Sequence, residues 1–149
     1  MKKISMIILA LAMMASCAAP EQPANENETV EVNDGVFIHM THGHDNPHRV
    51  LMPLQMAAMM APDKDVLIYM DIDAVKLLTQ DAEDVEYAHF TPFKESLANL
   101  LEMGVTIFAC PGCMKVHEIE EADLMEGIQV AQKDKFFNFT EGKIVSLTY

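Results

Sequence analysis

Three short runs of nearly continuous apolar residues constrain the fold of this 149-residue chain more than any other feature. They read GVFIHMTH (Gly35–His42), DVLIYMD (Asp65–Asp71) and VTIFA (Val105–Ala109). Each run has the length of a strand and carries β-branched or aromatic residues. Continuous apolarity, rather than alternation, is typical of strands that are covered on both faces, as in a parallel sheet.

Segments with helical patterns separate these runs. Val50–Met60 is apolar nearly all round and indicates a buried helix, which Pro53 either kinks or begins. Phe93–Leu101 has the spacing of an amphipathic helix, which Gly104 ends. We expect these further elements: a cap at Asp45 or Asn46 with Pro47 in the first turn, a short helix from Asp73 to Leu78, a helical turn from Pro111, a helix over EADLMEGI (121–128), a brief strand at Val130–Ala131, a short helix over KDKFFNFTE (133–141) and a last strand over KIVSLTY (143–149).

The alternation of strands and helices predicts a three-layer α/β domain over residues 35–149. Right-handed crossovers would give a mostly parallel sheet of about five strands, with helices on both faces. In such sheets the functional groups gather where the strands end. Here the three apolar runs end at His42 to His44, at Asp71 and Asp73, and at Cys110.

The amino-terminal residues resemble a bacterial lipoprotein signal peptide, residues 1–17. Lys2 and Lys3 precede an apolar run, and MASCAAP places small residues before Cys17. The resemblance implies that Cys17 is lipidated after cleavage. The protein would then be anchored in the bacterial cell envelope, on the periplasmic face or at the outer membrane. Ala18–Asp34 lacks hydrophobic periodicity and reads as a flexible acidic linker.

The charge balance disfavours a nucleic-acid partner. The chain has 10 basic and 23 acidic residues, a net charge of −13. Without Lys2 and Lys3, 8 basic residues remain against 23 acidic ones, a net charge of −15. Such a surface repels phosphate backbones and anionic headgroups.

Cys110 and Cys113 form a C-x-x-C pair after the third apolar run. A helix start at Pro111 would favour the Cys110 thiolate, and Lys115 and His117 could add positive charge. A reactive pair, an inert disulfide and a metal site all stay open at this point. The disulfide is permitted because an exported protein meets an oxidising compartment. A closed four-ligand zinc site lacks a second C-x-x-C.

The second candidate constellation is the histidine-rich segment HMTHGHDNPH. His42 and His44 could join Cys110 and Cys113 as ligands of copper or zinc, because imidazole and soft sulfur ligands suit these metals. Nearby methionines add thioethers, although their spacing also suits a helix core.

Three segments together resemble the DsrE/DsrF-like sulfur-relay family: THGHDNPHRVLMPLQMAAMM, VLIYMDIDAVKLL, and LLEMGVTIFACPGCMKVHEI with ADLMEGIQV. The resemblance implies a compact three-layer α/β domain that often assembles into oligomers. It also implies that Cys110, at the end of its strand, carries sulfur as a persulfide.

The sequence therefore predicts a lipid-anchored thiol or sulfur-handling protein, with Cys110 as persulfide or redox cysteine and Cys113 as its partner. Asp71, Lys115 and His117 would support the site, and no cofactor is required. The expected partners are a small sulfur compound or a protein thiol, and further copies of the chain. The alternatives are a non-catalytic copper or zinc module, and a structural lipoprotein with an inert Cys110–Cys113 disulfide.

Overall fold

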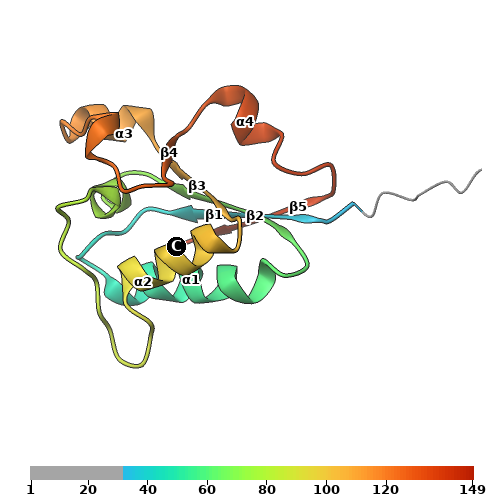
Figure 1. The fold of residues 1–149 in the computed structure, drawn as a ribbon, viewed down its shortest axis with the longest axis horizontal. Coiled ribbons are helices and arrows are strands. Elements are labelled where there is room, and N and C mark those ends of the chain that lie inside the picture. The colour runs from blue at the N-terminus through green and yellow to red at the C-terminus, as the bar shows by residue number, and fades with distance from the viewer. Residues whose placement is uncertain (1–31) are drawn as a thin grey trace, which may run out of the picture. The chain divides into compact units, whose positions relative to one another are not determined.

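A five-stranded parallel sheet organises residues 32–149, the part of the chain that the computed structural model describes. Its order is β4-β3-β2-β1-β5, and every neighbouring pair is parallel (Figure 1). The strands are β1 (Gly35–Met40), β2 (Asp65–Met70), β3 (Thr106–Ala109), β4 (Gln129–Val130) and β5 (Ile144–Thr148). The predicted parallel α/β fold is confirmed.

The helices lie on both faces of this sheet (Figure 1). On one face α1 (Pro47–Met60) and α2 (Phe93–Glu102) cover the sheet. Alternate residues of the central strands β1, β2 and β3 are buried beneath these two helices. On the other face Phe136 of α4 (Lys133–Phe137) packs edge-on against Tyr69, with ring centroids 5.0 Å apart. Because each fully buried large apolar side chain contributes about 1.5–3 kcal/mol, the α1–α2 layer carries most of the stabilisation. Its largest fully buried members include Ile38, Met40, Leu51, Leu54, Ile68, Met70, Phe93 and Leu97.

Helix α1 begins as the sequence predicts. The Asn46 side chain accepts a hydrogen bond from the Arg49 N–H at 3.2 Å, and Pro47 is the first helical residue. Pro53 lies buried inside the helix rather than at its start. At the end of α2, Gly104 adopts a left-handed conformation with φ of 82°, as expected for a residue that terminates a helix.

The helix predicted over residues 121–128 is wrong. Only η2 (Glu121–Asp123), one 3-10 turn, forms there. Leu124 instead pairs with Thr79 in an antiparallel bridge, and the Met125 N–H donates to the Leu78 carbonyl at 2.9 Å. These tertiary hydrogen bonds hold the backbone extended and outweigh the local helical preference.

Residues before β1 are tied to the end of the sheet. The Asn33 carbonyl accepts a hydrogen bond from the Thr140 hydroxyl at 2.8 Å, and Asp34 accepts from the Lys143 N–H at 3.0 Å. Although both lie in the segment that we assigned to the linker, these contacts attach them to the domain. The signal peptide, Cys17 and linker residues 18–31 lie outside the described residues.

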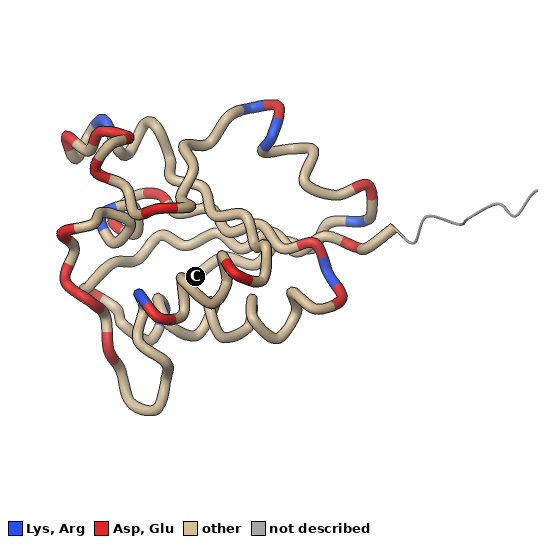
Figure 2. The backbone as a smooth tube through the Cα atoms, viewed as in Figure 1, with Lys and Arg blue, Asp and Glu red and all other residues tan. Residues whose placement is uncertain are grey.

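The connection between η1 (Ala74–Leu78) and α2 is one of the segments rich in acidic residues (Figure 2). Residues 79–92 carry four acidic residues and no Lys or Arg: Asp81, Glu83, Asp84 and Glu86. Within residues 32–149, no helix is both long enough and apolar enough to cross a membrane.

Candidate functional site

The carboxyl ends of the three central strands meet at one edge of the sheet. Beyond β2, the Asp71 N–H donates to the Met40 carbonyl at 3.1 Å, and beyond β3 the Cys110 N–H donates to the Met70 carbonyl at 3.0 Å. These two bonds continue the sheet ladder by one residue. They set Asp71 and Cys110 side by side, where the strand pattern predicted a functional edge.

Cys110 is the capping residue of α3 (Pro111–Val116). Its sulfur accepts a hydrogen bond from the Cys113 N–H at 3.4 Å. Tyr69 of β2 pairs in register with Phe108 of β3, two residues before Cys110. Burial alone would raise the pKa of the Cys110 thiol, but the Tyr69 phenol and the N–H groups of Cys113 and Gly112 outweigh it and lower that pKa. Cys110 is therefore the more readily ionised thiol.

Cys113 has the opposite electrostatic environment. Burial raises the pKa of its thiol, the neighbouring Cys110 and Asp71 raise it further, and the Ile72 N–H acts against them. Both cysteines are free thiols and half-buried. The pair is thus asymmetric, with one sulfur that favours the thiolate and one that favours the thiol.

Ile72 supplies backbone groups to this site from a left-handed conformation, with φ of 48°. Its N–H donates to the Cys113 sulfur at 3.1 Å, and its carbonyl accepts from His117 Nε2 at 3.0 Å. Since a carbonyl only accepts, the proton of His117 lies on Nε2. A β-branched residue rarely adopts positive φ. The contacts to Cys113 and His117 therefore hold Ile72 in a conformation that it would otherwise avoid.

Tyr69 and His39 belong to the site, although they were not among the predicted site residues. They pair across β1 and β2, with ring centroids 5.6 Å apart. His39 Nε2 lies 2.9 Å from Asp71 Oδ2. Neither that nitrogen nor Asp71 Oδ1 has a hydrogen-bond partner among the described residues, so the close contact is poorly aligned. The period of two along a strand, which sets Tyr69 and Asp71 on one face, was the available signal.

Of the other predicted supporting residues, His117 contacts the site and Lys115 does not. His117 reaches the site through Ile72, as described above. Lys115 is exposed, and none of its hydrogen bonds or ion pairs within residues 32–149 reaches a cysteine. Asp73, which follows the second apolar run but was not a predicted site residue, forms an ion pair with Lys76 at 2.6 Å.

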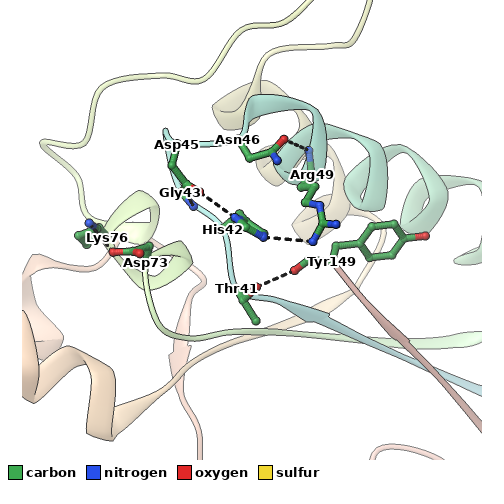
Figure 3. A network of polar contacts seen from close by, with 9 residues as sticks. All are labelled: Thr41, His42, Gly43, Asp45, Asn46, Arg49, Asp73, Lys76 and Tyr149. Carbon is green, nitrogen blue, oxygen red and sulfur yellow. Dashed lines mark hydrogen bonds and ion pairs between the residues drawn. The ribbon is translucent and has the colours of Figure 1, made fainter.

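His42 lies in a separate network of polar contacts around the start of α1 (Figure 3). His42 Nδ1 lies 2.7 Å from Asp45 Oδ2, and its Nε2 lies 3.2 Å from Arg49 Nη1. Because a guanidinium only donates, Nε2 accepts and Nδ1 carries the proton. The same His42 contact, with the Gly43 N–H, lowers the pKa of Asp45. Both ring nitrogens of His42 are thus occupied.

The structure brings together two of the four ligands that the sequence suggested for copper or zinc, Cys110 and Cys113. His44 is exposed and lines an open hollow with Asp45, Asp73 and Lys76. Within the described part of the chain, no three His, Cys, Asp or Glu side chains form a group that could hold a metal ion.

The arrangement can perform thiol chemistry in two steps. Cys110 has the hydrogen-bond donors that a nucleophilic thiolate requires. Cys113 lies one helical turn further on, close enough to interact with Cys110. The raised pKa of its thiol favours the protonated form. The geometry suits attack by the first sulfur and resolution by the second.

Solved structures of similar fold come from bacteria and an archaeon. The ychN protein from E. coli has a TM-score of 0.60 and 14% identity, over 79% of this chain and 100% of that one. MTH1491 from Methanobacterium thermoautotrophicum, a protein of unknown function, has a TM-score of 0.53 and 19% identity, over 77% and 99%. BT1422 from Bacteroides thetaiotaomicron, also of unknown function, has a TM-score of 0.52 and 20% identity, over 76% and 95%.

These identities are low, so the likeness establishes the fold alone. Comparison with curated proteins gave no significant match. The family model described as DsrE/DsrF-like matches residues 34–141, which include every strand except β5 and all the helices of the described part of the chain. The chain therefore belongs to the DsrE/DsrF-like family.

Proposed function

We propose that this protein handles sulfane sulfur, with Cys110 as the persulfide-forming cysteine and Cys113 as the resolving one. The observation that carries the proposal is the opposite environment of the two thiols. The hydrogen-bond donors around Cys110 favour its thiolate, whereas burial and neighbouring negative charge hold Cys113 as a thiol.

In the first step the Cys110 thiolate attacks the outer sulfur of a donor R–S–SH. The donor's S–S bond breaks, R–S⁻ leaves, and Cys110 carries an S–SH group. In the second step the Cys113 sulfur attacks Cys110 Sγ, and the outer sulfur leaves as hydrosulfide. The two cysteine sulfurs are oxidised to a disulfide while the sulfane sulfur is reduced. A small thiol or a protein dithiol then reduces the disulfide.

The same persulfide could instead pass its outer sulfur to a protein thiol. The proposed partners are therefore a small sulfur compound or a protein thiol. We also propose that Cys17 carries the lipid that holds the protein in the cell envelope. Assembly into a homo-oligomer, which the family resemblance implies, stays a prediction.

The proposal is tested by mixing the reduced protein with one equivalent of an alkyl persulfide. We expect the wild type to release hydrosulfide and to lose both thiols together. Cys110→Ser should release none, because the attacking sulfur is absent. Cys113→Ser should consume the donor without forming a disulfide. Equal hydrosulfide release by wild type and Cys110→Ser would contradict the proposal.

A further inference from the structure

We propose that a hollow beside α3 is the docking surface for a basic segment of the protein thiol that accepts sulfur from Cys110. The role of this partner rests on the proposed function, whereas the hollow itself does not. It has a volume of about 450 Å³ and is lined by residues of α3, of the segment that follows α3, and of β4.

Four apolar residues line the hollow: Pro111, Met114, Ile119 and Val130. Met114 is buried, Ile119 and Val130 are partly buried against the same core, and Pro111 is exposed. β4 is the last strand of the sheet in the described part of the chain, so the hollow lies at an unpaired sheet edge. An apolar side chain of a partner would lose contact with water here.

The other lining residues are charged, with three glutamates against one lysine: Glu118, Glu120, Glu121 and Lys115. None of the four forms an ion pair within residues 32–149. Between Lys115 and Lys133 the chain carries five acidic residues and no Lys or Arg, which makes this another of the acidic segments in Figure 2. A negative surface of this kind attracts a cationic partner and repels an acidic one.

The hollow lies on a different side of α3 from the contacts of Cys113. Pro111 and Met114 are three residues apart and share the face of α3 that lines the hollow. The Cys113 sulfur instead accepts the Ile72 N–H. Because a helix is about 10–12 Å across and an extended chain spans about 3.3 Å per residue, a partner anchored in the hollow reaches Cys110 with a cysteine about four residues away.

The transfer step balances without a further reagent. The partner's thiolate attacks the outer sulfur of the Cys110 persulfide, the S–S bond breaks, and the Cys110 thiolate leaves. The partner then carries the S–SH group, and no net oxidation has taken place.

The probes are synthetic peptides of about six residues, with a leucine at one end and a cysteine at the other. Two lysines follow the leucine in one peptide, and two glutamates follow it in the other. Cys113→Ser is first loaded with sulfur on Cys110, and transfer of that sulfur to each peptide is followed by intact mass.

Two charge reversals in this background separate the hollow from the net charge. Glu118→Lys with Glu121→Lys reverses the charge at the hollow. Glu95→Lys with Glu102→Lys is the matched control, because it changes the net charge equally at exposed residues of α2 that do not line the hollow.

We expect the lysine peptide to accept sulfur about tenfold faster than the glutamate peptide at low salt, and the difference to fall as salt is added. Reversal at Glu118 and Glu121 should abolish this preference, and the α2 control should retain most of it. Serine in place of the leucine should slow transfer to the lysine peptide, because the apolar contact is lost.

A second measurement does not depend on sulfur chemistry. Both peptides, with serine in place of cysteine, are titrated into the reduced wild-type protein while the methyl NMR signals of Ile119 and Val130 are followed. Only the lysine peptide should shift these signals. If Cys113→Ser takes up no sulfur but the lysine peptide shifts these signals, the proposed function fails and the docking surface stands.

Three outcomes would overturn the inference and leave the proposed function intact. One is transfer at equal rates to the two peptides. Another is an equal loss of preference in the α2 control, which would assign the effect to net charge. The third is faster sedimentation of the wild type than of the variant reversed at Glu118 and Glu121, which would show that a second copy of the chain fills the hollow.

Discussion

Ile72 allows a quantitative test of how the site is built. It adopts a φ of 48° while its N–H and carbonyl contact Cys113 and His117. Two variants separate backbone conformation from side-chain contacts. Ile72→Ala removes most of the side chain but keeps a Cβ, whereas Ile72→Gly removes the Cβ as well.

The magnitudes follow from exposure and conformation. Ile72 is 53% exposed, so either variant loses about half of the roughly 1.5–3 kcal/mol that full burial provides. Glycine costs a further 0.5–1 kcal/mol or so in chain entropy. It also removes a left-handed penalty of about 1–2 kcal/mol that alanine still bears. Ile72→Gly should therefore be more stable than Ile72→Ala by roughly 1 kcal/mol.

Denaturant unfolding of the reduced protein measures this difference. Met59, exposed within α1, is the control position, where Met59→Gly should be less stable than Met59→Ala by about 1 kcal/mol. An Ile72→Ala variant as stable as Ile72→Gly would refute the claim that positive φ at this position stores strain.

Two further predictions concern the cysteines. The first compares alkylation of Cys110 in the Cys113→Ser variant with alkylation of Cys113 in the Cys110→Ser variant. The alkylation rate of Cys110 should rise at lower pH, because the pKa of Cys110 is lowered and that of Cys113 is raised. The reverse order of the two pH profiles would contradict the assignment of nucleophile and resolving thiol. For the anchor, the protein expressed in a lipoprotein-processing bacterium should partition into detergent with a lipid-modified amino terminus, and Cys17→Ser should lose both properties; equal partitioning of the two would exclude Cys17 as the lipid site.

Much of the fold could be predicted from local patterns. The three continuous apolar runs became β1, β2 and β3, since strands buried on both faces have no polar positions to alternate with. The placement of Asp71 and Cys110 at one edge followed from parallel pairing alone. Residues 121–128 were misjudged because their backbone bonds go to Leu78 and Thr79, which are distant in the sequence.

The details of the site depended on information that the sequence does not display. The residue types do not predict that Ile72 adopts a positive φ, or that its N–H donates a hydrogen bond to the Cys113 sulfur. The histidines of the first loop attracted a metal hypothesis because of their number. The structure instead commits His42 to Asp45 and Arg49, through side-chain directions that no spacing rule specifies.

The central claim is that Cys110 holds sulfur and Cys113 removes it. Intact mass of Cys113→Ser after exposure to an alkyl persulfide, followed by proteolysis to locate the modification, tests that claim most directly. We predict one added sulfur atom, on Cys110, which a reducing thiol then removes. An unmodified Cys110, with or without sulfur elsewhere on the chain, would contradict the account.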